Sequence, residues 1–362
     1  MNKLFDKVYG ALIGAAIGDA MGGPVEGFTY EKIKEKYGFV EDLIDYDPEI
    51  KIAPHGPFSL TAGSYTDDSR MSKLFAKSII NKKGVPTKNE LTKLFYEEYF
   101  RSDDLLTKEF LEEYVEKAIF KEDKTCFGGQ PTNGAIMGIA PFGVISPCNP
   151  LKALTDSFDT LFMAEGYARY STAFAAASIS AAFIPNISVD GILSESLDAI
   201  KKHKSYIEGP HWQNSNMYPF VGMKNENLVT ECWKIGDKYK NIVEMQKPLR
   251  DIVVQQFFAD AAETLSIAMA FIKASDGDFS KSVIGCTNFG RDNDSTASVA
   301  GAIAGSYNGA SKIPSKWIDL VENNNPEPSF YDLSKELVKI IEFNNEENFK
   351  ITENISCLIN EQ

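Results

Sequence analysis

The sequence contains few of the residues that build most metal and disulfide sites. Only three histidines and five cysteines occur among 362 residues. The cysteines are odd in number, lie far apart and form no Cys-x-x-Cys pair, which argues against a disulfide framework and against a cysteine zinc site. The histidines do not cluster at ligand spacing either. Any bound metal must therefore take mainly oxygen ligands, and we expect a cytoplasmic location.

Basic charge and long apolar runs are also scarce. Lysine and arginine number 37 against 51 aspartates and glutamates, which gives a net charge of −14. This balance excludes non-specific nucleic-acid binding and an anionic membrane surface as default partners. No stretch reaches the roughly 18 apolar residues that span a bilayer. Residues 11–18 superficially resemble a signal peptide, but the run is short, glycine-rich and flanked by Asp6 and Asp19, so we expect no export.

Apolar residues recur mainly at helical spacing, whereas alternation at every second residue is hard to find. Amphipathic patterns at 71–79 and 257–271 predict helices, and the small-residue run 173–184 predicts a buried one. No linker, low-complexity tract or repeat divides the chain. We therefore predict an all-α, single-domain, many-helix protein over residues 1–325, followed by a C-terminal accessory helical segment over 326–362. We expect a monomer.

Two stripes of glycine recur at every fourth residue, a spacing that puts them on one face of a helix. Such a face lets another backbone approach closely, which offsets a helix-propensity cost of roughly 1 kcal/mol for each glycine. The expected role of both stripes is core packing, and each adjoins acidic residues whose positions the packing would fix. The first stripe is Gly10, Gly14, Gly18 and Gly22, and the second is Gly301, Gly305 and Gly309.

A first cluster of oxygen-bearing side chains, Thr66, Asp67, Asp68 and Ser69, stands just before an amphipathic pattern. Consecutive residues point about 100° apart on a helix, so they can converge on one ion only at its irregular N-terminus. A helix cap offers a simpler explanation, because Thr or Asp before a helix stabilises it by roughly 1 kcal/mol. One cap needs one such residue, however, and does not explain two adjacent carboxylates.

A second cluster, Asp292, Asp294, Ser295 and Thr296, precedes a helix expected at 297–308. It is no EF-hand loop, because the sixth and twelfth positions are Ala297 and Ile303 rather than Gly and Glu. The Asp-x-Asp-x-Thr loop of a phosphohydrolase with Asp292 as nucleophile remains an alternative. That loop would have to follow a strand in a Rossmann-like domain.

The two clusters together supply four carboxylates and two or three hydroxyls, without histidine or cysteine. All-oxygen ligands favour a hard divalent ion, Mg²⁺ first and Mn²⁺ or Ca²⁺ next. Four carboxylates exceed what one small ion needs. Two ions about 3.5–4 Å apart, bridged by one carboxylate, would use them all.

These motifs, in their order, resemble the ADP-ribosylglycohydrolase family, which includes dinitrogenase-reductase-activating glycohydrolase. The resemblance covers residues 8–320 through five segments: 11–26, 66–69, 132–137, 290–305 and 313–317. It implies an all-α, many-helix orthogonal bundle with two Mg²⁺ or Mn²⁺ ions in a cleft. It also implies a hydrolase that cleaves the glycosidic bond at the ribose anomeric carbon of an ADP-ribosylated protein side chain or a related ADP-ribosyl compound.

The resemblance assigns roles to individual residues of this sequence. Thr66, Asp67 and Asp68 would bind one ion, Asp292 and Ser295 the other, and Asp294 would bridge the two ions. Glu26 matches the family's mobile active-site carboxylate and is our candidate general acid or base, with Asp68 or Asp294 as the base on the metal side. The substrate would contact Gln130, Thr132, Asn133, Gly134 and Gly290.

This chain departs from the family pattern on the substrate side. Gly138 follows Met137 where the family usually has arginine, and residues 167–172 lack the usual histidine. Hydrolysis of another small N-riboside or nucleotide derivative therefore stays open, as does a non-catalytic ADP-ribose-binding protein. Residues 205–221 mix aromatics with amides, which fits either a wall that stacks on a base or a loop packed over the core.

Overall fold

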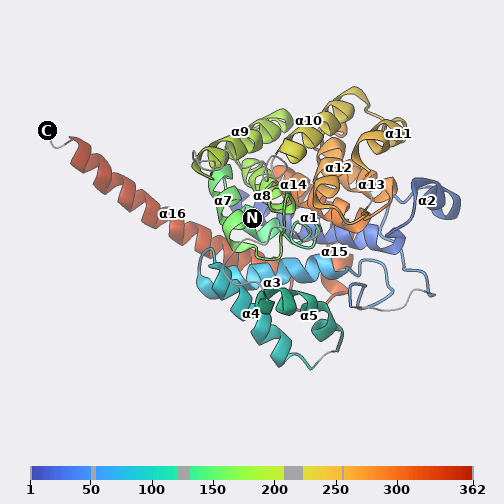
Figure 1. The fold of residues 1–362 in the computed structure, drawn as a ribbon, viewed down its shortest axis with the longest axis horizontal. Coiled ribbons are helices and arrows are strands. Elements are labelled where there is room, and N and C mark those ends of the chain that lie inside the picture. The colour runs from blue at the N-terminus through green and yellow to red at the C-terminus, as the bar shows by residue number, and fades with distance from the viewer. Residues whose placement is uncertain are drawn as a thin grey trace.

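The computed structural model describes residues 2–49, 54–103, 105–120, 131–207, 223–254 and 257–360. Within these ranges the regular structure is helical, accompanied by only two isolated β-bridges (Figure 1). The prediction of an all-α fold is confirmed. The longer helices are α1 (Lys3–Gly22), α3 (Asp67–Lys82), α4 (Lys88–Arg101), α5 (Leu105–Phe120), α8 (Ala168–Ala181), α9 (Val189–Ile207), α10 (Met223–Lys238), α12 (Ala261–Ala274), α14 (Asn293–Asn308) and α16 (Phe330–Asn360). The shorter ones are α2 (Tyr30–Tyr37), α6 (Ala140–Val144), α7 (Pro150–Thr160), α11 (Ile242–Val253), α13 (Phe279–Phe289) and α15 (Ser315–Asn323), with 3₁₀ turns at Gly23–Val25 and Ala310–Lys312.

The centre of the fold is a close antiparallel pair of helices, α1 and α14, formed by the two glycine stripes. A Cβ atom added to Gly301 would lie 2.0 Å from the carbonyl oxygen of Gly14, and one added to Gly305 would lie 2.0 Å from that of Gly10. No side chain fits at such distances, so the expected packing role of the stripes is confirmed. The pairing also brings the C-terminal end of α1 against the first residues of α14, where the second acidic cluster stands.

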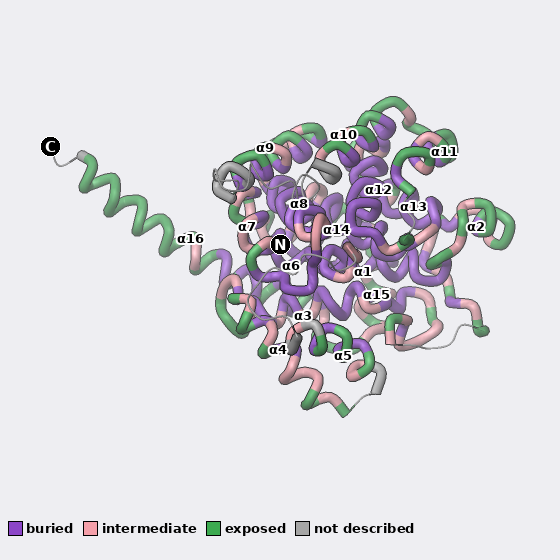
Figure 2. Tube along the Cα trace, viewed as in Figure 1, coloured by how far each residue is buried: buried purple, intermediate pink, exposed green. Residues whose placement is uncertain are grey.

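Helix α1 is buried from Val8 onward, in the middle of the bundle (Figure 2). By length and composition the stretch Lys3–Val25 is apolar enough to cross a membrane, contrary to our expectation that no stretch would be. The whole of its most apolar window is buried inside the protein. The same apolar character is what a central core helix requires, because every one of its faces meets other helices.

Some boundaries differ from those expected from periodicity. The pattern at 257–271 predicted a helix from Phe257, but α12 begins only at Ala261. The side chain of Asp260 accepts hydrogen bonds from the backbone N–H groups of Ala262 and Glu263, and so caps the helix there. In contrast, α14 starts at Asn293, four residues before the expected Ala297, although its N-cap residue Asp292 makes no side-chain capping hydrogen bond. The buried small-residue helix is present as α8.

The structure describes the predicted C-terminal helix but only the beginning of the predicted aromatic segment 205–221. Helix α9 ends at Ile207, and the rest of the proposed aromatic wall, 208–221, lies outside the described residues. The predicted C-terminal helix is present as α16. Its first turns pack against α1 and α3, and its second half projects away from the bundle (Figures 1 and 2).

The glycine contact between α1 and α14 yields a stability prediction. Gly301→Ala places a methyl group on the Gly14 backbone, and we expect the free energy of unfolding to fall by about 2–3 kcal/mol, since such overpacking cannot relax without separating the helices. Thermal and denaturant unfolding measure the change. The matched control is Gly84→Ala, whose added methyl meets nothing within 4 Å; an equal loss of stability in both variants would contradict the close packing.

Candidate metal centre

The first acidic cluster is held in place by a buried carboxylate on the central helix. Asp19 of α1 is fully buried. Its Oδ1 atom accepts hydrogen bonds from the backbone N–H (2.9 Å) and the hydroxyl (2.8 Å) of Thr66. Its Oδ2 atom accepts from the backbone N–H (2.9 Å) and the hydroxyl (2.6 Å) of Ser69. These four bonds fasten the first turn of α3 to α1.

Thr66 occupies the N-cap position of α3, yet its side chain makes no capping hydrogen bond. The hydroxyl instead bonds to Asp19 and approaches Asp294 Oδ2 at 3.4 Å. The capping explanation for this cluster therefore does not account for the threonine. Asp19 itself was not predicted as part of the site; the signal for it was a lone acid inside an otherwise apolar, glycine-rich helix.

The loop that carries Glu26 is held against the loop that leads into α14. Two backbone hydrogen bonds connect them, from Gly27 N–H to the Arg291 carbonyl (2.7 Å) and from Arg291 N–H to the Phe28 carbonyl (2.8 Å). Gly290 makes this approach possible: its φ is +84°, and an added Cβ would lie 2.3 Å from the Phe28 carbonyl oxygen. Gly290 was predicted to contact substrate, and here it sets the spacing of two loops.

Arg291 also anchors the site to a second helix. Its guanidinium forms an ion pair with Glu263 of α12, including a 3.0 Å bond from Nη2 to Oε2. Glu263 is buried. Nη2 also donates to the Phe257 carbonyl at 3.3 Å. Arg291 therefore connects the Glu26 loop, the second acidic cluster and α12.

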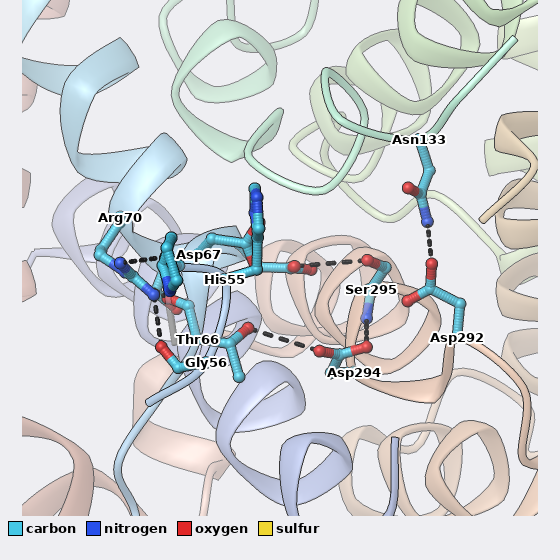
Figure 3. Close-up of polar contacts among 12 residues, drawn as sticks. His55, Gly56, Thr66, Asp67, Arg70, Asn133, Asp292, Asp294 and Ser295 are labelled. Carbon is cyan, nitrogen blue, oxygen red and sulfur yellow. Dashed lines mark hydrogen bonds and ion pairs between the residues drawn. The ribbon is translucent and has the colours of Figure 1, made fainter. Parts of the chain in front are cut away.

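The two acidic clusters meet between the N-termini of α3 and α14 (Figure 3). Carboxylate oxygens of Glu26, Asp292 and Asp294 all lie within 4.8 Å of one another. The Ser295 hydroxyl donates to Asp68 Oδ2 at 3.3 Å. The prediction that side chains more than 200 residues apart converge on one centre agrees with these contacts, and Glu26 joins them directly.

Asp67 stands at the edge of this centre. Its Oδ2 atom lies 2.8 Å from Nδ1 of His55, and the His55 ring packs edge-on against Phe110. The neighbouring Arg70 donates to the carbonyl oxygens of Thr66 (3.3 Å) and Pro54 (2.6 Å). His55 was not predicted to contribute, because a lone histidine in a loop of glycine and proline offers no ligand spacing.

The carboxylates of the centre are crowded and removed from water. Burial raises the pKa of Asp68 and of Asp294 well above the usual value, and their charged neighbours raise it further. Burial also raises the pKa of Asp292. Glu26 is exposed at the rim, but the surrounding protein partly desolvates its carboxyl group, and with Asp292 nearby its pKa rises to about 8. Such a cluster is stable only with bound protons or a bound cation.

The donor set fits a hard divalent cation. Every candidate ligand atom is a carboxylate or hydroxyl oxygen, which suits Mg²⁺, Mn²⁺ or Ca²⁺. Asp68 Oδ1 is buried and has no hydrogen-bond partner among the described residues. A buried carboxylate oxygen without a donor is costly, and a cation would satisfy it. The described centre therefore can hold a metal ion, and the assignment of individual ligands stays a prediction.

Asn133 meets the centre from the opposite side (Figure 3). Its carboxamide nitrogen donates to Asp292 Oδ2 at 2.8 Å and to the Thr264 hydroxyl at 3.1 Å, so this group positions Asp292. Thr132 forms an isolated β-bridge with Asp260, and Gly134 lies beside the Tyr114 hydroxyl. The predicted contact Gln130 lies outside the described residues.

The departures from the family pattern have structural counterparts. A Cβ at Gly138 would lie 2.7 Å from Met71 Cγ and 2.8 Å from the Ser72 nitrogen, so α3 leaves no room for an arginine at this position. In the segment without histidine, the Tyr167 hydroxyl donates to Asp260 Oδ2. Because Asp260 also pairs with Thr132, this tyrosine stands beside the predicted substrate loop.

The phosphohydrolase alternative is wrong. Its nucleophile loop must follow a strand, but the residues before Asp292 form helix α13, which ends at Phe289. The described part of the chain has no Rossmann-like sheet.

The chain is similar to known proteins over nearly its whole length. The family model described as ADP-ribosylglycohydrolase matches residues 1–347. No curated protein sequence matches the chain. A solved structure described as an ADP-ribosylglycohydrolase-related protein complex matches with a TM-score of 0.64 and 20% identity, over 94% of this chain and 100% of that one. At this identity the structural match shows a shared fold, whereas the family match includes both acidic clusters.

The raised pKa values of the clustered acids predict how the stability of the protein depends on pH. Their native pKa values lie above those of the unfolded chain, about 4, so the native state binds more protons and loses stability as pH rises. With chelator present, the melting temperature should fall between about pH 5 and pH 8, the latter being the native pKa of Glu26. Added Mg²⁺ should remove most of this decline by replacing the protons.

Asp294→Asn tests the origin of that effect. The variant should show a weaker decline in chelator and little stabilisation by Mg²⁺, because one buried charge is gone. Asp251→Asn, a change at an exposed acid of α11, should behave like the unaltered protein. A melting temperature that rises from pH 5 to pH 8 in chelator would contradict the proposed crowding.

Proposed function

Because the chain belongs to the ADP-ribosylglycohydrolase family, we propose that it is a hydrolase that uses two divalent ions to cleave the bond at the ribose anomeric carbon of an ADP-ribosylated protein side chain. One observation carries this proposal. Carboxylate oxygens of Glu26, Asp292 and Asp294 lie within 4.8 Å of one another, and Thr66 and Asp68 of the first cluster contact Asp294 and Ser295 of the second. A purely structural role does not explain five acids in one small region, because their mutual repulsion destabilises the fold.

The proposed ion ligands follow from the two clusters. Thr66, Asp67 and Asp68 would hold one ion, and Asp292 and Ser295 the other, with Asp294 between them. The contacts of Thr66 with Asp294 and of Asp68 with Ser295 support a shared centre, because each joins the two clusters. Two such ions, Mg²⁺ or Mn²⁺, would hold the ribose hydroxyls and make an adjacent water more acidic.

Hydrolysis then requires two proton transfers. A water oxygen forms a bond to the anomeric carbon as the bond from that carbon to the leaving atom breaks, through an oxocarbenium-like state. The leaving atom gains a proton, for which Glu26 is the candidate donor. Glu26 is placed for this transfer, because one of its carboxylate oxygens lies within 4.8 Å of those of Asp292 and Asp294. Asp68 or Asp294 would accept the proton from the water.

A second candidate is hydrolysis of another small N-riboside or nucleotide derivative. It is supported by the Tyr167–Asp260 contact beside Thr132 and by Gly138, which differ from the family pattern near the predicted substrate loop. A non-catalytic ADP-ribose-binding protein is the third candidate. It is disfavoured because all six proposed ion-ligand positions carry oxygen donors.

Calorimetric titration of ADP-ribose, first with Mg²⁺ and then with chelator, separates these candidates. We expect binding in the micromolar range that disappears with the metal, and release of free ADP-ribose from an ADP-ribosylated protein under the same conditions. Binding without any release would support the non-catalytic candidate. If ADP-ribose does not bind while the metal is bound, the result favours the second candidate, hydrolysis of a small N-riboside.

Glu26→Gln tests the proton-transfer role. The variant keeps the size of the side chain but cannot donate an acidic proton, so kcat should fall by about 10²–10⁴-fold while the affinity for Mg²⁺ changes little. Glu35→Gln, on the exposed surface of α2, is the matched control and should leave kcat unchanged. If Glu26→Gln instead loses the metal, Glu26 is an ion ligand and the assigned role is incorrect.

A further inference from the structure

Arg291 has a backbone conformation that is unusual for a residue with a side chain. Its φ angle is +66°, in the left-handed region where glycine is the common residue. A residue persists in this conformation only when its surroundings outweigh the strain, and such residues concentrate at functional sites. None of the other described non-glycine residues with positive φ adjoins an acidic cluster in the sequence; they are Lys83, Cys148, Asn186 and Asp276.

The side chain of Arg291 makes a contact that can stabilise this backbone. Nε and Nη2 of the guanidinium both donate to the carboxylate of Glu263, Nη2 at 3.0 Å. Two parallel bonds of this kind fix the direction of the side chain as well as its position. The Glu263 side chain is only 2% exposed and that of Arg291 is 19% exposed, so salt weakens their attraction little.

Glu263 belongs to a part of the bundle that is held firmly in place. All residues of α12 except Lys273 are buried, and the helix packs against α8, α10, α13 and α14. The side chain of Asp260 accepts a hydrogen bond from the Glu263 N–H at 3.0 Å. The ion pair therefore connects Arg291 to a fixed point outside the Glu26 loop.

The Glu26 loop is held by the peptide groups of the same arginine. The Arg291 N–H donates to the Phe28 carbonyl at 2.8 Å, and the Arg291 carbonyl accepts from the Gly27 N–H at 2.7 Å. Because peptide planes are rigid, the φ and ψ angles of Arg291 determine how these two groups are oriented relative to each other. A return to negative φ would turn at least one of them away from the loop.

Packing around Gly27 does not restrain the loop in the same way. A Cβ atom added to Gly27 would meet nothing within 4 Å, so open space lies beside the residue that follows Glu26. Gly27 also has a positive φ of +72°, and glycine changes its backbone angles at little cost. The hydrogen bonds to Arg291 are therefore the contacts that hold this part of the loop.

We propose that Arg291 is the positioning residue for Glu26. Its ion pair with Glu263 stabilises the left-handed backbone, and that backbone holds the Glu26 carboxyl group within 4.8 Å of the carboxylates of Asp292 and Asp294. This role rests on the proposed function, in which Glu26 donates a proton to the leaving atom. Arg291 acts through the loop and takes no part in the proton transfer.

A purely structural role for the ion pair makes a different prediction. In that case the pair would only attach α12 to the neighbouring loop, and the backbone angle of Arg291 would not matter. Glycine adopts a φ of +66° without strain, whereas alanine does not, and neither can form the ion pair. Alanine and glycine at this position therefore separate the two roles.

Hydrogen exchange at the Gly27 amide tests the proposal in the protein without metal. Arg291→Ala and Arg291→Gly are each combined with Glu263→Gln, so that no buried carboxylate loses its counter-charge. The exchange rate should be about tenfold higher in the alanine variant than in the glycine variant, because alanine disfavours the left-handed backbone by about that factor. Thermal unfolding shows that both variants are folded.

The kinetics of ADP-ribose release provide a second readout. In the alanine variant kcat should fall by about 10²-fold, the effect of a misplaced reacting group, while KM changes little. The glycine variant should retain most of the activity. Mg²⁺ affinity should change less than kcat in both, because Asp292 keeps its hydrogen bond from Asn133.

Lys83 offers a matched control. It also has a positive φ, +57°, but lies exposed at the C-terminal end of α3. Lys83→Ala and Lys83→Gly should leave both the exchange rate of the Gly27 amide and kcat unchanged.

Two results would overturn the positioning role. One is an equal exchange rate of the Gly27 amide in the alanine and glycine variants. The other is an unchanged kcat in the alanine variant although Glu26→Gln lowers kcat. If Glu26→Gln itself leaves kcat unchanged, the proton-donor role in the proposed function fails, and the exchange comparison still shows whether Arg291 holds the loop.

Discussion

The structure depends on the contact between the backbones of α1 and α14. Glycine on both helices removes the side chains that would separate them, and the antiparallel pairing then brings the acidic end of α1 to the start of α14. Asp19 extends this constraint to α3 through four hydrogen bonds to Thr66 and Ser69. The geometry of the site therefore depends on the core packing, since a shift of α1 or α14 would separate the two acidic clusters.

Because the helices hold the acidic clusters close together, the carboxylates destabilise the folded state unless protons or a cation neutralise them. Several carboxylates with raised pKa values share a buried region, and Asp68 presents an unbonded oxygen inside it. The surrounding helices must hold these groups against their mutual repulsion. A divalent cation would convert that repulsion into attraction, which is the physical reason to regard the cluster as a functional site rather than a by-product of packing.

Short contiguous motifs made the all-α fold and the meeting of the two acidic clusters predictable from the sequence. The glycine stripes and the acidic runs each lie within a few residues, so local spacing shows them. The role of Asp19 could not be derived in the same way, because its partners are 47 and 50 residues away. The contact of Gly290 with Phe28 is also long-range. Periodicity misplaced the start of α12, since the Asp260 cap outweighs the apolar spacing of Phe257.

Substrate contacts were the least predictable part of the site. Asn133 was expected to line the substrate pocket, but its amide nitrogen supports Asp292. Only the three-dimensional arrangement shows which group such a side chain binds. Gly138 similarly looks like the loss of a substrate residue in the sequence, whereas in the structure it accommodates α3.

The most direct test of the shared centre is the anomalous scattering of Mn²⁺ in crystals of the protein. The account predicts Mn²⁺ density between the N-termini of α3 and α14, with Asp294 in contact and with Asp68 and Asp292 on opposite sides. Strong Mn²⁺ density elsewhere on the molecule, with these carboxylates hydrogen-bonded only to one another, would contradict it.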